Sequence, residues 1–169
     1  MNEVVKLNND NNTLNLTDAD VNTLINLSKE VLKQHNIKLT ERAKGDIKIS
    51  STTSDEQFIL NYFVRPGSVT LNFRETRYNL CLIRLNLNDR FHKNSDNTRV
   101  HGNRINIYSQ KEFSLKADHS SYMVAHKLPY KCFEDSRNFM NQLFTLLKYT
   151  NTVYDDKIFI ETSLFLGGD

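Results

Sequence analysis

The stretch that decides the fold spans residues 58–73 and reads FILNYFVRPGSVTLNF. On both sides of the Pro66-Gly67 pair, apolar side chains occupy every second position. Such alternation is typical of a strand with one buried face, and a Pro-Gly pair favours a tight turn. The stretch therefore predicts a β-hairpin.

The two-residue period continues on both sides of this hairpin. In residues 80–87 it predicts an apolar face made of Cys81, Ile83, Leu85 and Leu87. The opposite face then carries Leu80, Leu82, Arg84 and Asn86. A polar loop is expected at residues 88–103, and further strands are expected at 47–49, 104–108, 122–128 and 157–160.

Helical spacing of apolar residues occurs near the two ends of the chain. Thr17 is a suitable N-cap, Asp20 stands three residues later, and apolar residues recur at helical spacing to about His35. A second amphipathic segment covers residues 135–149. The sequence predicts one helix in each of these segments.

The order of these elements predicts the α+β class. Strands joined by short turns, with helices only at the two ends, indicate an antiparallel meander sheet with an N-terminal and a C-terminal helix packed on one face. A length of 169 residues suits one domain. We expect residues 1–15, which are polar, to be a mobile lead-in, and residues 16–169 to form a single α+β domain.

Composition indicates the cellular compartment. The apolar runs are only a few residues long, so no membrane span is predicted, and the polar N-terminus lacks the apolar region of a signal peptide. These features favour a cytoplasmic protein. Cys81 and Cys132 have no paired spacing and are expected to be buried thiols.

Residue usage points to the source of the chain. It contains 21 Asn and only 4 Ala, which is far from average usage and typical of an AT-rich genome. A low-GC bacterium, or a phage or mobile element living in one, fits this bias. The cytoplasm in question is then that of the host cell.

Positive charge is concentrated in one part of the chain. The formal net charge is only +2, yet residues 65–104 hold eight basic and three acidic residues. Strand alternation places Arg74, Arg84 and Arg104 on one side of the sheet, where arginine suits phosphate and where Tyr78, Phe91 or Tyr108 could stack on bases. The predicted nucleic-acid-binding residues are Arg74, Arg77, Arg84, Arg90, Lys93, Arg99, Arg104 and Tyr108. The alternative is an ordinary solvated sheet face, on which arginines pair with Glu75 or Asp89.

Titratable side chains also gather in the polar loop. His92, Asp96 and His101 are residue types that can share acid-base work or hold a metal in phosphodiester cleavage. Their spacing matches no known metal signature, and the phosphate-binding, dinucleotide-binding and hydrolase motifs are missing from the sequence. The sequence therefore predicts no cofactor and no metal site.

Three segments carry a resemblance to a known family. Residues 82–87 read LIRLNL, residues 92–96 read HKNSD, and residues 102–108 read GNRINIY. Together with the helix start LTDAD at 16–20, they resemble a domain-of-unknown-function family of small proteins from low-GC Gram-positive bacteria and their prophages. Its members carry a Leu-x-Arg-Leu-Asp strand, a His-x-Asn-Pro-Asp-Gly turn and a His-x-His-x-Tyr strand. The resemblance covers about residues 16–150.

The chain departs from this family pattern at several positions. Arg104 and Asn106 stand where members have the His-x-His pair, and Ser95 and Asn97 replace the Pro and Gly of the turn. If the paired histidines serve catalysis or metal binding in relatives, this chain has lost that capacity and gained a positive charge. The resemblance therefore favours a binding protein over an enzyme.

Three functional hypotheses follow from the sequence. The leading one is a non-enzymatic phage or mobile-element protein that antagonises a host defence ribonucleoprotein, in the manner of an anti-CRISPR, by binding RNA or an RNA-protein complex through a basic sheet face. The second is a small nuclease or phosphoesterase that uses His92, Asp96 and His101. The third is a protein-only interaction module with Phe139 and Phe144 in an exposed apolar patch.

Overall fold

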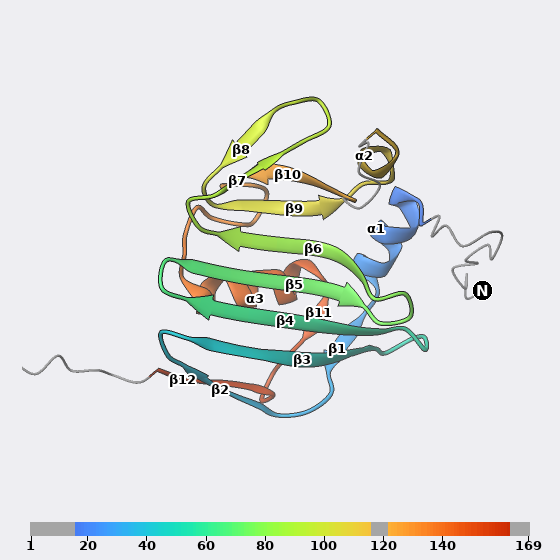
Figure 1. Ribbon diagram of the computed structural model, residues 1–169. Coiled ribbons are helices and arrows are strands. Elements are labelled where there is room, and N and C mark those ends of the chain that lie inside the picture. Colours follow the sequence, from blue (N-terminus) through green and yellow to red (C-terminus); the bar gives the residue numbers. More distant parts are fainter. Residues whose placement is uncertain (1–15, 116–121, 163–169) are drawn as a thin grey trace, which may run out of the picture.

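The computed structural model describes residues 16–115 and 122–162 and shows a broad twisted sheet with three helices (Figure 1). The predicted lead-in at residues 1–15 lies outside the described residues. No helix in the described ranges is long and apolar enough to cross a membrane. The elements in chain order are α1 (Asp18–Asn26), β1 (Lys29–Val31), β2 (His35–Leu39), β3 (Ala43–Ser51), β4 (Gln57–Arg65), β5 (Ser68–Glu75), β6 (Leu80–Leu87), β7 (Phe91–Lys93), β8 (Arg99–His101), β9 (Arg104–Tyr108), α2 (Gln110–Leu115), β10 (Met123–Lys127), α3 (Phe139–Tyr149), β11 (Thr152–Val153) and β12 (Ile158–Thr162).

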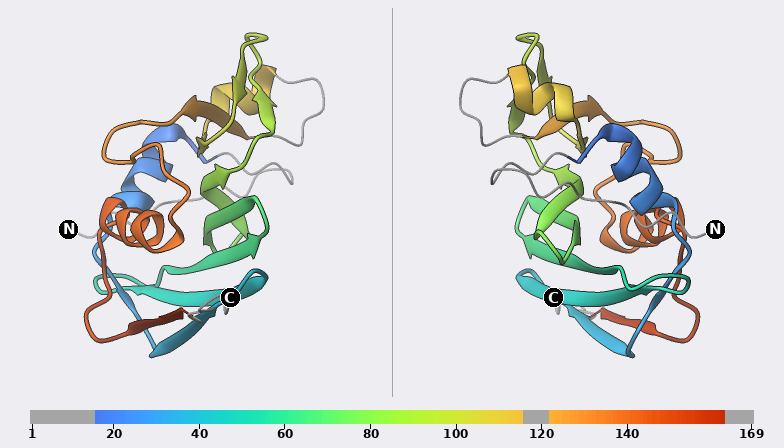
Figure 2. Two further views of the ribbon diagram at one scale, coloured as in Figure 1. Left: turned by 90° about the vertical axis from the view of Figure 1, so that its left-hand side faces the viewer. Right: turned by 90° about the vertical axis from the view of Figure 1, so that its right-hand side faces the viewer.

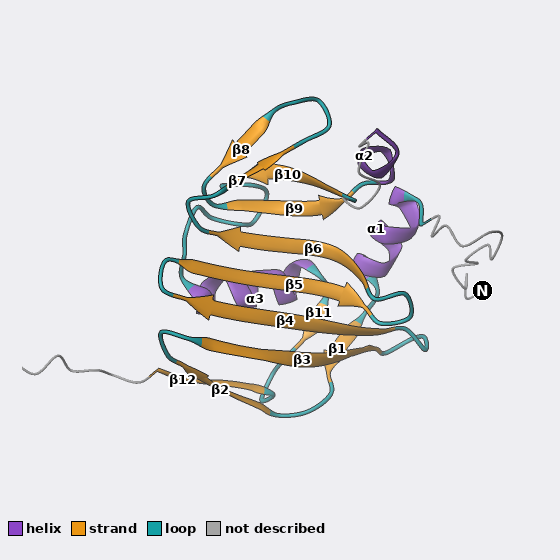
Figure 3. Cartoon of the chain, in the orientation of Figure 1, coloured by secondary structure: helices purple, strands orange, loops and turns teal. Residues whose placement is uncertain are grey.

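Eight strands form the main sheet, in the order β10-β9-β6-β5-β4-β3-β1-β11. Neighbouring strands run antiparallel, except β1 and β11, which run parallel. Two smaller sheets accompany it, the parallel pair β2 and β12 and the β7–β8 hairpin (Figure 3). The prediction of an α+β protein with a mostly antiparallel sheet is confirmed.

The predicted hairpin at residues 58–73 is formed by β4 and β5. Arg65 pairs with Ser68 across the Pro66-Gly67 turn, and Gly67 adopts a φ of 70°, a left-handed conformation that glycine tolerates without a steric penalty. Phe58 and Phe73 are buried, and their rings stack with centroids 5.2 Å apart.

Helices α1 and α3 lie on the same side of the sheet in the two views of Figure 2. Their apolar residues, including Leu24 and Leu146, belong to one buried cluster with the sheet residues Leu60 and Leu71. The ring of Phe139, at the start of α3, meets the ring of Tyr62 edge to face at 5.5 Å. The opposite side of the central strands β4, β5 and β6 faces the viewer in Figure 1.

The helices begin as predicted but differ from the prediction in length and number. Thr17 and Asp20 form the expected reciprocal cap at the start of α1. The prediction that this helix continues to about His35 is wrong, because Lys29–Val31 pair with β3 as strand β1. The buried positions Lys29 and Val31 satisfy the period of a strand, so tertiary pairing overrides the helical pattern. Helix α3 starts at an Asn138 cap, and α2 was not predicted.

A β-bulge changes the expected faces of β6. Ile83 pairs with Phe73, but Cys81 pairs with Arg74, so the register shifts between these pairs. Leu80 and Leu82 are therefore buried, in contrast to the prediction that they share a face with Arg84. The bulge removes the conflict between buried leucines and a charged sheet face.

The two cysteines differ in environment. Cys81 is half-buried, and burial raises the pKa of its thiol although Arg84 and Arg74 nearby oppose the shift. Cys132 is exposed. The prediction of two buried thiols is thus wrong for Cys132, which lies in the irregular segment before α3.

A fully buried lysine joins three segments of the fold. The ammonium group of Lys29 donates hydrogen bonds to the carbonyl oxygens of Ile25 at 2.8 Å, Leu27 at 2.8 Å and Thr150 at 2.7 Å. It also lies 4.9 Å from the centre of the Phe58 ring, within the range of a cation–π interaction. Lys29 thereby ties the ends of α1 and α3 to the sheet.

Replacing this lysine should destabilise the protein without changing its shape. Lys29→Met keeps most of the side-chain volume but removes the ammonium donor from three carbonyl oxygens, of which only that of Thr150 keeps another, longer bond, from the Thr152 hydroxyl at 3.4 Å. We expect it to lower the free energy of unfolding by about 3 kcal/mol, measured by urea denaturation followed by circular dichroism. Lys33→Met, at an exposed position, is the control and should change stability by less than about 0.5 kcal/mol. Equal urea midpoints for the two variants would contradict this role of Lys29.

The same residue should make stability depend on pH. Burial lowers the pKa of Lys29 from 10.5 to about 7, whereas the unfolded chain keeps the ordinary value. Between these two values the unfolded state binds more protons, so the free energy of unfolding should rise with pH. Urea denaturation at pH 7 and pH 9 should show a larger rise for the wild type than for Lys29→Met. Parallel pH dependences would exclude the effect.

Candidate nucleic-acid interface

The strand register arranges polar side chains in rows across the open face of the sheet. Phe63 pairs with Thr70, Thr70 pairs with Asn86, and Asn86 pairs with Arg104. Paired residues on adjacent strands point to the same side of a sheet. The neighbouring row consists of Asn61, Asn72, Arg84 and Asn106.

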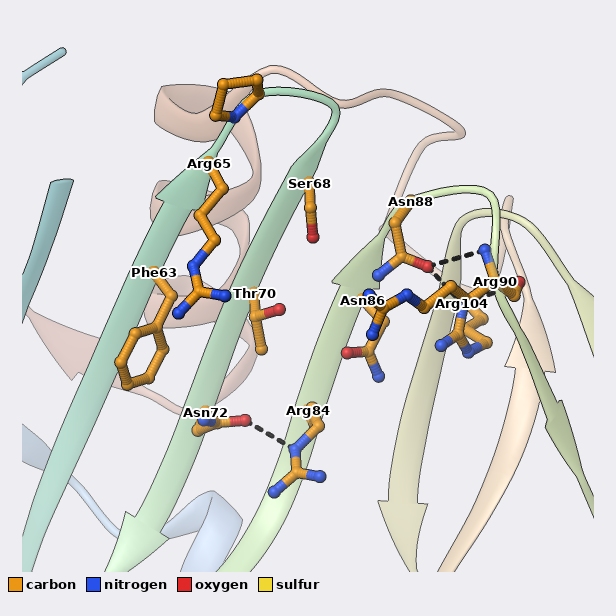
Figure 4. Close-up of a pocket in the computed structure, with 11 residues that line it drawn as sticks. Phe63, Arg65, Ser68, Thr70, Asn72, Arg84, Asn86, Asn88, Arg90 and Arg104 are labelled. Atoms are coloured by element: carbon orange, nitrogen blue, oxygen red, sulfur yellow. Dashed lines mark hydrogen bonds between the residues drawn. The ribbon is translucent and has the colours of Figure 1, made fainter. Parts of the chain in front are cut away.

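A groove of about 460 Å³ lies on this face (Figure 4). Its hollow shape follows from side-chain length, because Ser68 and Thr70 on β5 are short while Phe63 and Arg65 on one side and Arg104 on the other are long. We call this site the arginine groove. Its lining residues are Phe63, Arg65, Pro66, Ser68, Thr70, Asn72, Arg84, Asn86, Asn88, Arg90 and Arg104.

The arginine groove is strongly positive. Four arginines line it and no lining residue is acidic. Within the described part of the chain, Arg77 forms an ion pair with Glu56 and Arg137 forms one with Asp89, and neither pair involves any of these four arginines. Positive charges gathered in a concave site without counter-charges attract anions. The alternative of cross-strand ion pairs with Glu75 or Asp89 is therefore not what the groove shows.

Arg84 is the arginine from the central strand β6. Its Nε donates to Oδ1 of Asn72 at 2.7 Å, which fixes the direction of the side chain across the row. The acceptor is a neutral amide, so the bond orients the guanidinium without neutralising it. Arg84 therefore presents a positioned charge to the groove.

Arg104 is held still more firmly. It is only 6% exposed, and its Nη1 donates to Oδ1 of Asn88 at 3.0 Å and to the carbonyl oxygens of Arg90 at 3.1 Å and Gly102 at 2.9 Å. Its enclosed Nε has no hydrogen-bond partner. Burial, assisted by the charge of Arg90, lowers the pKa of Arg104. A buried guanidinium that meets only neutral acceptors favours an approaching anion.

The structure separates Arg74 and Arg77 from the groove. Arg74 lies on the same face but lines a neighbouring hollow of about 360 Å³, where its side chain donates to the amide and carbonyl oxygens of Asn79. Arg77 lies in the β5–β6 turn and pairs with Glu56 at 3.5 Å. Of the eight residues predicted from the sequence, only Arg84, Arg90 and Arg104 line the arginine groove.

Lys93 and Arg99 lie on the β7–β8 hairpin, where they pair with each other. Phe91 and His101 form the other pair on the same face of the hairpin, and the Arg99 guanidinium lies 5.0 Å from the centre of the Phe91 ring. These residues are exposed, so the hairpin carries a second basic and aromatic surface beside the groove.

Tyr108 is buried, contrary to the expectation that its ring could stack on a base. Its hydroxyl donates to the carbonyl oxygen of Leu16 at 2.7 Å, and its ring stacks on that of Tyr122. Burial raises the pKa of Tyr108 to about 12. The ring therefore has no free face for a ligand.

The three residues of the nuclease hypothesis do not come together. His92 pairs with Val100 whereas His101 pairs with Phe91, so the two histidines lie on opposite faces of the hairpin. Asp96 is in the hairpin turn, and hydrogen bonds from Thr98 lower its pKa. Within residues 16–115 and 122–162, no group of three His, Cys, Asp or Glu residues could hold a metal ion.

The apolar patch of the protein-only hypothesis is not formed by the predicted residues. Phe139 is 4% exposed and contacts Tyr62, and the ring of Phe144 stacks on Tyr154 with centroids 4.9 Å apart. Both belong to, or pack against, the apolar cluster beneath the sheet.

The β7–β8 hairpin is anchored by buried polar side chains that the sequence did not single out. The Asn94 amide donates to the carbonyl of Ala125 at 3.2 Å and accepts from its N–H at 2.9 Å. The carboxylate of Glu112 in α2 accepts from the backbone N–H and the hydroxyl of Ser95. These contacts fix the hairpin that begins directly after Arg90.

Phe63 and Arg65 are the groove residues that the sequence-based prediction missed. Both continue the odd-numbered positions of β4, which alternate with the buried Phe58, Leu60 and Tyr62, so the strand period assigns them to the open face. The alternation in β4 is visible in the sequence. It does not reveal that the short side chains on β5 leave a hollow beside Phe63 and Arg65.

Comparison with known proteins places the chain in a family without an established activity. No curated protein and no solved structure matches it. A family model described as a family of unknown function, DUF6978, matches residues 16–152. The matched residues include every residue that lines the arginine groove. The chain therefore belongs to this family of unknown function.

Proposed function

We propose that the arginine groove binds RNA, free or within a ribonucleoprotein, and that the protein acts by binding and not by catalysis. The observation that supports this most strongly is the set of four arginines lining one groove without an acidic residue. The planar fork of a guanidinium matches the oxygens of a phosphate, and phosphate contacts supply most of the affinity of nucleic-acid binding.

The neutral residues of the groove suit the remaining parts of a nucleotide. Asn72, Asn86 and Asn88 lie among the arginines. An amide side chain both donates and accepts hydrogen bonds, so it can meet a base edge or a ribose hydroxyl. A groove for a simple inorganic anion would not need this mixture of groups.

The proposal extends to a biological setting. The high Asn and low Ala content supports a phage or mobile-element source, and a host defence ribonucleoprotein is a partner that would offer RNA to such a protein in the host cytoplasm. We propose antagonism of such a complex, in the manner of an anti-CRISPR. The positive charge at Arg104, where the resembling family has histidine, supports binding over nuclease action.

Reversing one charge in the groove should weaken RNA binding. Arg84→Glu places a carboxylate opposite the phosphates, and we expect the Kd for a labelled single-stranded RNA to rise about 10- to 100-fold, measured by fluorescence anisotropy. Arg42→Glu, at an exposed position outside the groove, makes the same change in net charge and is the matched control. Equal losses in the two variants would show that only net charge matters and would overturn the proposed site.

The dependence of RNA affinity on salt concentration should report how many phosphates the groove contacts. If Arg65, Arg84 and Arg104 each contact one phosphate, the slope of log K against log salt concentration should be about −2 for a single strand. Arg84→Gln should reduce the size of this slope by about 0.7. The same titration between 50 and 200 mM salt tests both values. An unchanged slope in the variant would remove Arg84 from the phosphate contacts.

A further inference from the structure

An exposed aromatic ring stands at one side of the arginine groove. Phe63 is 40% exposed, whereas Phe58 on the same strand and Phe73 on the next are 1% and 0% exposed. It shares the open face with Arg65, two residues further along β4. Exposure of a large apolar ring to water is unfavourable, so a ligand that covers the Phe63 ring would gain binding free energy from burying it.

The register places this ring opposite a fixed cation. Phe63, Thr70, Asn86 and Arg104 lie in one row across four adjacent strands. Adjacent strands are about 4.8 Å apart, so the backbones at Phe63 and Arg104 are about 14 Å apart. The groove between them is floored by shorter side chains (Figure 4). One side of the groove thus offers a π surface beside Arg65, and the other side offers the fixed charge of Arg104.

A single nucleic-acid strand has groups for both sides. Its unpaired bases can stack on an aromatic ring while its phosphates meet arginine. A duplex keeps its bases stacked inside and presents mainly phosphates and ribose, so Phe63 would have no partner there. An acidic peptide would meet the arginines but would not carry a planar base to the ring.

We infer that the arginine groove takes single-stranded RNA and that the ring of Phe63 stacks on one of its unpaired bases. The inference rests on the proposed function and deepens it. The arginines hold the backbone, and Phe63 selects strands whose bases are free.

The test compares one RNA sequence as a single strand and as a duplex. We expect the wild type to bind the single strand about tenfold more tightly than the duplex in anisotropy measurements. Phe63→Leu keeps the apolar character but removes the π surface, and it should weaken single-strand binding about tenfold without affecting the duplex. Phe63→Tyr should bind within about twofold of the wild type, because its ring can still stack.

A matched control separates stacking from a general loss of exposed aromatic surface. Phe159 on β12 is 47% exposed and lies outside the arginine groove. Phe159→Leu should therefore bind both RNAs as the wild type does. A 2-aminopurine base in the single strand adds a direct readout, since its fluorescence should be quenched by the wild type and not by Phe63→Leu.

Failure of the inference differs from failure of the proposed function. If Phe63→Leu binds the single strand as tightly as the wild type, or if the duplex binds equally well, the inference is overturned. The proposed function stands in that case, provided that Arg84→Glu still weakens binding. If the wild type binds neither RNA, both are overturned. Tighter binding of a polyglutamate peptide than of RNA, lost in Arg84→Glu, would overturn both in favour of a protein partner.

Discussion

The hydrogen bonds of the Lys29 ammonium group join the parts of the molecule that the sequence keeps far apart. Two of its acceptors end α1, and the third, Thr150, ends α3 about 120 residues later. Burying a cation is unfavourable unless its donors are satisfied, so the three carbonyls and the lysine depend on one another. Helices α1 and α3 share one buried apolar cluster with the sheet, and the residues that line the groove lie outside this cluster.

Two local features give that side its character. The bulge at β6 turns Leu80 and Leu82 toward the helices while Arg84 remains on the outer face. The short side chains of β5 then leave space between longer ones on the flanking strands. The apolar packing and the positive groove therefore use the same strands without competing for the same side.

Alternation along each strand was enough to predict the hairpin at residues 58–73 and the antiparallel α+β class. It could not predict the bulge, because a bulge depends on how two strands pair and not on either strand alone. Burial of Tyr108 depends on its contacts with Leu16 and Tyr122, which are distant in the sequence. The placement of His92 and His101 on opposite faces depends on how the two short strands β7 and β8 pair. Within the candidate site, strand alternation placed Arg74, Arg84 and Arg104 on one face, but only the spatial arrangement shows that Arg74 lines a different hollow from the other two.

The contact between Asn94 and Ala125 has a consequence for how the molecule behaves in a crowded cell. Strand β10 forms one margin of the main sheet, and an open margin is a template on which another polypeptide can assemble. Asn94 occupies both the N–H and the carbonyl of Ala125, and the His92 ring lies 3.2 Å from the carbonyl of Met123. Side chains of the β7–β8 hairpin thus contact backbone N–H and carbonyl groups on the free edge of β10, where an additional strand would otherwise pair. The hairpin that stands beside the groove therefore also covers backbone groups at which another polypeptide would otherwise pair with this edge of the sheet.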